Sequence, residues 1–380
     1  MACIDFALTR NDHARVIGLT AAIAAHLRSV GPWPQALALH AAAARAAQHL
    51  GDRPAHANAL LDLADVLHLT SDNPGADEAL VQARDIYRDI GDRLGEASAL
   101  TALGTVRRLA GDYSGATGRL NHSLAIFREI GDLPAEAKPL RALGAVRQLT
   151  GDYPGAATLM ERALDISRRN DDRLGEAHAL FGLGAVRHLT ADYPGATRVL
   201  EQALGIYRRI GSRLGEAYAL QYLGDTRRAA RDYPGAIGVL EQGLDICREV
   251  GDRLGEAYTL LCLGRVWRAV RDFAGATRVL EQALGISQRI GDQGGEAEVL
   301  NETGSVRLAQ RDPIQAYACY QRALKLARAT GARLEEARAL EGIGQCPEQM
   351  CDTSTAATAL ERALEIYQRL GAADAARLAM

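Results

Sequence analysis

The sequence predicts an all-α solenoid of nine helix-turn-helix repeats, each 40 residues long. Near-identical segments recur along the chain: GDRLGEA begins at Gly91, Gly211 and Gly251, and DDRLGEA begins at Asp171. A second segment, GDYPGA or a close variant, begins at Gly111, Gly151, Ala191, Arg231 and Arg271. No insertion or deletion interrupts this register from residue 11 to residue 370. A fixed period of roughly 20–50 residues indicates stacked supersecondary units rather than separate globular domains.

The composition agrees with closely packed helices in a reducing compartment. Hydrophobic residues make up 48% of the 380 residues, but aromatic residues only 5%. The six cysteines form no CxxC pair, so we expect reduced thiols, no metal and no cofactor. No apolar run approaches about 20 residues and no signal peptide is apparent, so we expect a cytoplasmic protein without membrane contact. With a net charge of −3, nucleic acid is not an expected partner of this region.

Each repeat is expected to contain two amphipathic helices, called here helix A and helix B, with position 1 at glycines such as Gly91. In residues 91–130, Asp92 and Asp112 are candidate N-caps of the two helices. The expected apolar faces are Leu94, Ala97, Leu100, Leu103 and Val106 in helix A, and Ala116, Leu120, Leu124, Phe127 and Ile130 in helix B. A glycine recurs inside helix A, at Gly104 and at each 40-residue step to Gly304. Glycine in a helix costs about 1 kcal/mol, so we expect close approach of helix B there.

The ends of the array are expected to differ from its middle. We interpret residues 1–380 as one solenoid in which residues 11–50 form a degenerate N-terminal capping repeat and residues 51–330 form seven regular repeats. Residues 331–370 form a divergent last repeat, in which Pro347 should break the last turn of helix A. Residues 371–380 resemble the truncated start of a further helix, so we expect the chain to be a fragment of a longer protein; the alternative is a short natural protein whose last helix is a cap.

The spacing Leu100-x2-Leu103-Gly104, followed by Ala116, Leu120 and Ser123, resembles the tetratricopeptide repeat in a form lengthened to 40 residues. That resemblance implies a right-handed α-α superhelix with a concave groove lined by helix A. The array is similar to those of Pins-type adaptors, kinesin light chains and, most of all, actinobacterial STAND/NB-ARC regulators of the AfsR-like kind. One departure is that the family's helix-A aromatic is replaced by an arginine column at position 17, for example Arg107. We interpret this column as inter-repeat ion pairs or a solvated edge.

No catalytic motif accompanies the repeats. The sequence contains no GxxxxGK[ST], HExxH or GxSxG segment, so we expect no enzymatic activity in this region. Aspartates at positions 2 and 22 and glutamates at position 6 do recur. Because a catalytic pair is needed once whereas a helix cap is needed in every helix, we interpret these carboxylates as structural.

The residues that differ between repeats are the candidates for recognition. Helix A varies at positions 8, 11, 12, 15 and 18, a spacing that places these positions on one face of the helix. The predicted groove residues are His178, Phe181, His188, Tyr218, Gln221, Tyr222, Asp225, Arg228, Tyr258, Cys262, Arg265, Arg268, Glu298, Asn301 and Glu302. Tyrosine and arginine on one surface are typical of interface hot spots. The structural alternative is that Tyr218 and Tyr258 only cover a neighbouring helix.

The sequence therefore predicts a non-catalytic scaffold that binds a protein or peptide in its concave groove. By resemblance, the array would be the sensor or partner-recognition region of a larger STAND-type signalling or transcriptional regulator. A small-molecule sensor with the ligand inside the superhelix stays open as an alternative, as does a self-associating adaptor that forms homo-oligomers through its array ends.

Overall fold

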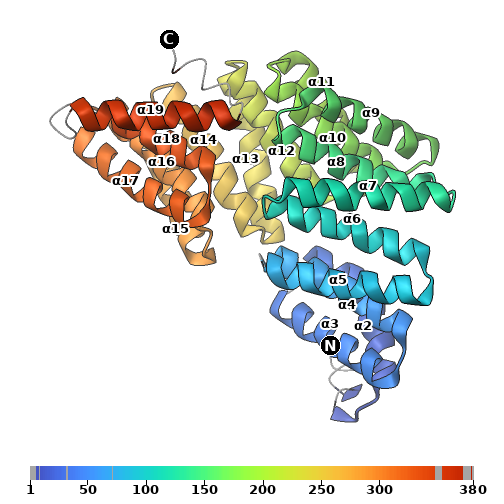
Figure 1. Cartoon of the computed structure of the whole chain (residues 1–380). Helices are drawn as coiled ribbons and strands as arrows, with labels where there is room; N and C mark the ends of the chain where they lie inside the picture. Colours follow the sequence, from blue (N-terminus) through green and yellow to red (C-terminus); the bar gives the residue numbers. More distant parts are fainter. Residues whose placement is uncertain are drawn as a thin grey trace. The chain divides into compact units, whose positions relative to one another are not determined.

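The computed structural model describes residues 6–7, 9–30, 33–70, 72–346, 353–370 and 378, and these residues form helices without any strand. Figure 1 shows the helices, which follow one another as antiparallel pairs. Their bounds are α2 His13–Val30, α3 Trp33–Leu50, α4 Arg53–Leu69, α5 Asn73–Ile90, α6 Arg93–Leu109, α7 Tyr113–Glu129, α8 Ala137–Leu149, α9 Tyr153–Arg169, α10 Arg173–Leu189, α11 Tyr193–Ile210, α12 Arg213–Ala229, α13 Tyr233–Val250, α14 Arg253–Ala269, α15 Phe273–Ile290, α16 Gln293–Ala309, α17 Pro313–Thr330, α18 Arg333–Gly344 and α19 Thr353–Leu370. A short 3-10 helix, η1 Pro134–Glu136, precedes α8. The predicted all-helical solenoid of paired helices is confirmed.

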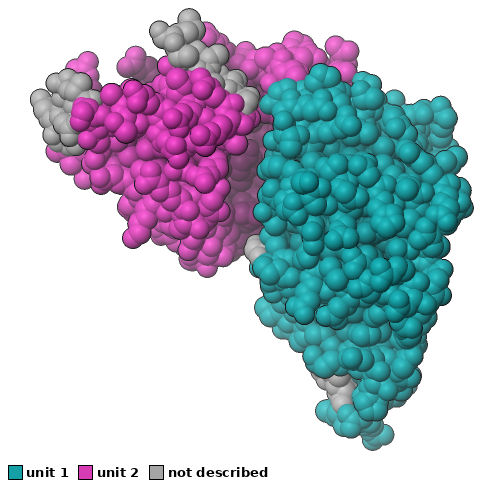
Figure 2. Space-filling view, viewed as in Figure 1, with its two compact units in different colours: residues 1–182 teal, residues 183–380 magenta. Residues whose placement is uncertain are grey.

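The chain divides into two compact units, residues Met1–Gly182 and Leu183–Met380, which are coloured separately in Figure 2. Within each unit, helix A and helix B of a repeat pack against each other, as α6 and α7 do in unit 1 and α12 and α13 in unit 2. Successive A helices of unit 2 also touch, because α12 contacts α14, α14 contacts α16 and α16 contacts α18. None of the described helices combines the length and the apolar character needed to cross a bilayer.

The helices begin where the recurring aspartates cap them. Asp92 Oδ1 accepts a hydrogen bond from the Gly95 amide at 2.8 Å at the start of α6, and Asp112 Oδ1 accepts one from the Gly115 amide at 2.8 Å at the start of α7. Side-chain acceptors at this position satisfy amides that have no partner within the helix. The predicted capping role of these aspartates is confirmed.

The glycine inside each helix A marks the closest approach of the two helices of a repeat. A Cβ atom added to Gly224 of α12 would fall within 3.0 Å of the Leu240 side chain of α13, and one added to Gly104 would meet Leu120 in the same way. Leu120 and Leu240 are themselves completely buried. The predicted reason for these glycines, close helix packing, is confirmed.

Replacing Gly224 with alanine should therefore destabilise the protein by about 1–3 kcal/mol, because Leu240 must leave its preferred position to make room. Chemical denaturation followed by circular dichroism measures this change. Gly238 of α13 is the matched control, since nothing lies within 4 Å of a Cβ placed there. Gly238→Ala should leave stability unchanged or raise it by up to about 1 kcal/mol. Equal effects of the two substitutions would contradict the packing argument.

The glutamate at position 6 joins most of the regular repeats to the one before them. Glu256 of α14 is 5% exposed, and its carboxylate forms ion pairs with Arg248 of α13 at 2.9 Å and with Arg253 of its own helix at 2.7 Å. The arginine at position 38 of the preceding repeat forms the same ion pair with Glu136, Glu176, Glu216 and Glu336. Burial alone would raise the pKa of Glu256, but the hydrogen bonds from Arg248 and Arg253 lower it overall. These glutamates thus act as inter-repeat clamps.

Replacing Glu256 with glutamine should cost about 1–2 kcal/mol at pH 7, because charge-assisted bonds to two arginines are lost. A folded-state pKa below the unfolded value of 4.5 stabilises the protein above that pH, and this contribution disappears as the pH falls through the folded-state pKa. The stability difference between wild type and Glu256→Gln should therefore shrink as the pH is lowered below about 4.5. Glu241→Gln, an exposed position of α13, is the control and should show neither effect.

The arginine column at position 17 makes inter-repeat ion pairs. Arg107 of α6 contacts Asp77 of α5 at 2.9 Å, and Arg227 of α12 contacts Glu201 of α11 at 3.0 Å. Both pairs join a helix A to the helix B that precedes it. The structural interpretation of the column is confirmed for these arginines.

The predicted apolar faces of the helices are wrong for two residues next to the turns. Leu94 is 51% exposed and Ile130 is 40% exposed, so their predicted places on buried faces are wrong. Each of the two residues lies next to a tight turn between helix B of one repeat and helix A of the next, away from the packed face of the helices. Leu174, Leu214 and Leu254 are exposed at the same position as Leu94.

Helix A of the repeat at residues 331–370 is shorter than those of most other repeats. α18 has 12 residues and ends at Gly344, three residues before Pro347. Pro347 itself lies outside the described residues, and so do residues 371–380 except Leu378. Leu378 packs against the core cluster of the last repeat, which contains Tyr320 and Tyr367. The divisions proposed at residues 11–50, 51–330 and 331–370 stay predictions.

Candidate functional site

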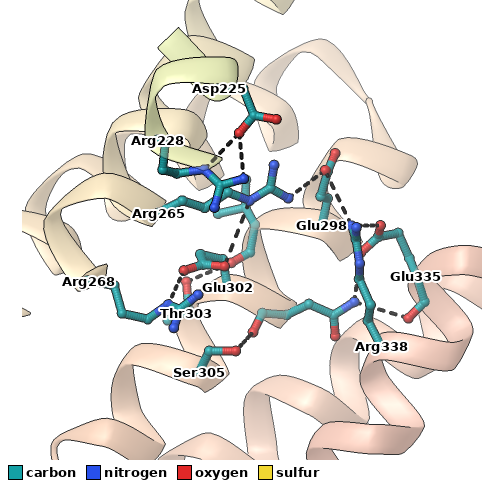
Figure 3. A network of polar contacts seen from close by, with 12 residues as sticks. Asp225, Arg228, Arg265, Arg268, Glu298, Glu302, Thr303, Ser305, Glu335 and Arg338 are labelled. Atoms are coloured by element: carbon teal, nitrogen blue, oxygen red, sulfur yellow. Dashed lines mark hydrogen bonds and ion pairs between the residues drawn. The ribbon is translucent and has the colours of Figure 1, made fainter. Parts of the chain in front are cut away.

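The A helices of unit 2 enclose a charged cavity. Its volume is about 570 Å³, and α12, α14, α16 and α18 supply most of its lining. The charged residues of the lining are Asp225, Arg228, Arg265, Arg268, Glu298, Glu302, Glu335, Arg338 and Glu341, and His188 of α10 lies at one end. Figure 3 shows the contacts that connect the charged side chains Asp225, Arg228, Arg265, Arg268, Glu298, Glu302, Glu335 and Arg338. The cavity thus brings together charged residues from four successive A helices.

Ion pairs run from one A helix to the next across the cavity. On α12, Arg228 contacts Asp225 at 2.7 Å, and His188 lies 3.4 Å from the same carboxylate. On α14, Arg265 contacts Glu298 of α16 at 2.7 Å. Arg268 pairs with Glu302 of α16, which also lies 3.8 Å from Arg265. Each pair from α14 to α16 therefore joins neighbouring repeats while facing the cavity.

The network continues onto the last repeat. Arg338 of α18 contacts Glu335 at 2.6 Å and lies 3.7 Å from Glu298. Glu341 accepts hydrogen bonds from the Tyr367 hydroxyl and the Gln345 amide, both at 2.9 Å. Ser305 of α16 lies 3.2 Å from the hydroxyl of Tyr320.

The electrostatic environment favours the charged forms of Asp225 and Arg265. Burial alone would raise the pKa of Asp225, but Arg228 and Arg265 lower it overall. Burial would lower the pKa of Arg265, yet Glu298 and the other acids around it hold the pKa well above its usual value. Burial lowers the pKa of His188 despite Asp225, which favours the neutral imidazole. Burial raises the pKa of Glu335 despite the nearby Arg338.

Two of the predicted groove residues, Gln221 and Asn301, have their side chains occupied between repeats. The amide of Gln221 donates to the Gly255 carbonyl at 3.0 Å and to the Thr259 hydroxyl at 2.7 Å. The amide of Asn301 donates to the Glu335 carbonyl at 3.0 Å. Both residues are at position 11, and both bond to the carbonyl at position 5 of the next repeat.

This bond depends on the residue at position 37 of the same repeat, in helix B. Position 37 is tyrosine in several repeats, and Tyr87 and Tyr207 fill the space beneath the position-5 glycine that follows them. Position 37 is small, Cys247 and Ala327, in the repeats of Gln221 and Asn301. In unit 1 the same combination recurs, because Arg141 reaches the Gly175 carbonyl at 3.4 Å where position 37 is Ser167. In these three repeats a polar side chain at position 11 accompanies a small one at position 37, whereas in residues 251–290 the small Ser287 accompanies Leu261.

Replacing Gln221 with leucine should lower the free energy of unfolding by about 1–3 kcal/mol, since the buried Thr259 and Gly255 groups lose a hydrogen-bond donor. Thermal denaturation measures the loss. Leu261 occupies the same position in the next repeat, so a leucine at this position is compatible with helix A. A variant as stable as wild type would show that the bond contributes nothing.

The predicted aromatic and thiol residues have mixed surroundings. Cys262 is completely buried in a core cluster, and burial raises the pKa of its thiol to about 12. Tyr258 is half-buried against the same cluster, in agreement with the covering role considered for it. Tyr218 is 38% exposed, and Tyr222 is half-buried. None of these four residues lines the cavity.

The remaining predicted residues fall into two groups. His178 and Phe181 lie in unit 1, on α10, and are not part of the unit 2 cavity. His188, Asp225, Arg228, Arg265, Arg268, Glu298, Asn301 and Glu302 all line that cavity. Whether any of these residues binds a partner stays a prediction.

Sequence reasoning missed the contribution of the last repeat. Arg338 and Glu341 occupy positions 8 and 11, the same variable positions used for the earlier repeats, but residues 331–370 were treated as divergent. Glu335 replaces the glycine found at position 5 in Gly215, Gly255 and Gly295. That replacement was the available signal for Glu335. Among the described residues, no group of three or more His, Cys, Asp or Glu side chains is arranged to hold a metal ion.

Comparison with known proteins identifies the family. The tetratricopeptide repeat family model matches residues 17–89, 135–209 and 295–369, which together make up more than half of the chain. The protein therefore belongs to the tetratricopeptide repeat family. No curated protein sequence matches this chain.

Solved structures share the fold at low sequence identity. A Rap protein complexed with competence and sporulation factor has a TM-score of 0.67 and 14% identity, over 93% of this chain and 98% of that one. A STAND protein with a tetratricopeptide repeat sensor from Pyrococcus horikoshii has a TM-score of 0.60 and 14% identity, over 94% of this chain and 52% of that one. Aspartyl phosphate phosphatase F from Bacillus subtilis has a TM-score of 0.60 and 10% identity, over 96% of each chain. At these identities the likeness concerns the fold alone.

Proposed function

We propose that this protein is a non-catalytic scaffold that recognises a peptide segment of a partner protein, and that the charged cavity of unit 2 is its recognition site. The observation that carries the proposal is the convergence of charged side chains from α12, α14, α16 and α18 on one cavity. The volume of about 570 Å³ lies within the range of roughly 300–1,000 Å³ that is usual for ligand sites.

The charge content of the cavity favours recognition over a purely structural role. Replacing buried ion pairs with apolar residues is often neutral or stabilising, so packing alone does not require them. The cavity gathers nine charged residues, whereas Glu256 and Arg107, which make inter-repeat contacts elsewhere, have two charged partners each. Charged groups with fixed partners and fixed geometry discriminate between ligands, because a ligand that leaves them unpaired is rejected.

The structural relatives support a peptide as the ligand. The Rap structure described above contains competence and sporulation factor, and a Rap conjugation gene regulator of plasmid pLS20 has been solved in complex with the Phr* peptide. The STAND relative carries its tetratricopeptide repeats as a sensor. By analogy, we propose that this array is the sensor or partner-recognition region of a larger cytoplasmic signalling or transcriptional regulator of STAND type.

Selection of random heptapeptides displayed on phage against the full chain tests the proposed function. Calorimetry on a synthetic version of a selected peptide then gives its affinity. Arg228→Ala and Arg268→Ala should each weaken binding by about tenfold or more, because each removes a charged group from the cavity. Arg278→Ala is the matched control, since Arg278 is exposed on α15 outside the cavity.

Two outcomes would contradict the proposal. One is that no peptide is enriched in the selection. The other is that the selected peptides bind wild type and both cavity variants with equal affinity, which would place the recognition site elsewhere on the chain.

A further inference from the structure

An apolar groove lies between the last two B helices of unit 2, and it is called here the α17–α19 groove. Its volume is about 690 Å³. α17 and α19 supply its walls, and Leu340 and Ile343 of α18 supply its floor. The charged cavity is lined by other residues of α18, among them Arg338 and Glu341, at positions that fall on the opposite face of the helix. The groove and the cavity therefore share no lining residue.

The last repeat has a smaller side chain in the wall of the groove than earlier repeats have at the same place. Position 29 of helix B is a buried valine in three successive repeats, at Val199, Val239 and Val279. In the last repeat the same position is Ala359, which lines the groove. Because alanine lacks the two methyl groups of valine, the wall formed by α19 leaves room at this point for an apolar side chain of a ligand.

The groove is elongated along the helix axes. On α17 it is lined by Tyr317, Gln321, Leu324 and Arg328, whose spacing of three or four residues places them on one face of the helix. From Tyr317 to Arg328 the helix advances eleven residues, or about 16 Å at 1.5 Å per residue. Tyr317 and Leu324 are only half-buried, so apolar surface is accessible along this length. A groove of these dimensions fits about three turns of an amphipathic helix with apolar anchors at i, i+3 or i+4, and i+7.

The charged residues of the lining are all basic. They are Lys325 and Arg328 of α17 and Arg362 of α19, and no carboxylate is among the described lining residues. In earlier repeats the same surface of helix B is acidic. Position 31 is glutamate in four successive repeats, as in Glu241, but the groove has Gln321 there. Position 35 is Asp165 or Asp245 in two of those repeats, but the groove has Lys325. The sign of the charge thus reverses where the groove opens.

This positive charge is accessible to a ligand. Lys325 is exposed and makes no ion pair with any described residue. Arg362 contacts Glu365 at 2.7 Å, but both side chains are about half exposed. Such surface pairs contribute little to stability, so a carboxylate of a ligand can take the place of Glu365. Arg328 is also exposed, although its Nε is used by the clamp of the last repeat.

We propose that the α17–α19 groove binds an amphipathic helix of a partner protein. The apolar face of that helix packs on Tyr317, Leu324, Leu340 and Ile343. Aspartate or glutamate residues on its flank pair with the basic side chains in the C-terminal halves of α17 and α19. The site is additional to the charged cavity and independent of it.

A library of helix-forming peptides displayed on phage tests the groove on the full chain. The peptides have an alanine framework and randomised residues on one face. The library is first depleted on Thr358→Trp, which places a bulky side chain at an exposed position of the groove wall, and is then selected on wild type. Enriched peptides should have apolar residues at i, i+3 or i+4, and i+7, flanked by aspartate or glutamate. Fluorescence anisotropy of a labelled synthetic peptide then gives its affinity.

Variants with matched controls locate the binding. Lys325→Glu should weaken the selected peptide at least tenfold, because it reverses the charge that meets the acidic flank. Thr358→Trp should weaken it at least as much by filling the groove. Lys138→Glu changes the other lysine of the chain, which is exposed on α8, and should have no effect. Thr158→Trp should likewise have no effect, since Thr158 is exposed at the equivalent position of α9 and its hydroxyl bonds to a carbonyl as that of Thr358 does.

Circular dichroism checks that each variant is folded. If Thr358→Trp is not, Lys325→Glu takes its place in both the depletion and the comparison. Three results overturn the proposal: no peptide survives the depletion, the enriched peptides are neutral or basic, or folded Lys325→Glu binds as tightly as wild type. A wild-type dimer in sedimentation velocity that Thr358→Trp converts into a monomer would assign the groove to a second copy and overturn the partner helix. Undiminished peptide binding in Arg228→Ala and Arg268→Ala is expected, and it separates the groove from the cavity.

Discussion

The buried glutamate at position 6 is the contact on which the stacking of repeats depends. Glu256 is held by one arginine of the preceding helix B and one of its own helix, and Glu176, Glu216 and Glu336 are held in the same way. The arginine from the preceding repeat reaches this buried carboxylate only when consecutive repeats keep one relative placement. Because the clamp recurs every 40 residues, successive A helices within a unit present the same face in the same direction.

The cavity of unit 2 extends this inter-repeat pairing to the variable face of helix A. Arg265 and Arg268 of one repeat meet Glu298 and Glu302 of the next, so acid and base alternate between repeats. The pairing continues onto α18, where Arg338 contacts Glu335 at 2.6 Å and lies 3.7 Å from Glu298.

The fold could be predicted from the sequence because the signals that determine it are repeated. The aspartate caps and the glycines facing Leu120 and Leu240 occur in almost every repeat and report local, physically simple constraints. The site was predicted only in part. Helical periodicity shows which residues share a face, but not which side chains are used by the neighbouring repeat, and so Gln221 and Asn301 were not recognised as inter-repeat contacts. Their role depends on residues 26 positions away, Cys247 and Ala327, whose small size becomes meaningful only once the helices are packed.

The cavity draws its walls from four successive A helices, and this has a consequence for how the array comes apart. Repeats in a linear stack are joined only through successive interfaces, and α18 has 12 residues where α12, α14 and α16 have 17 each. A bound ligand that touched both α12 and α18 would connect their repeats through contacts that bypass the intervening interfaces. Fraying of the last repeat and release of the ligand then become a single event. In a chain of this kind, binding of a ligand in the cavity would increase the order of the C-terminal helices rather than change their shape.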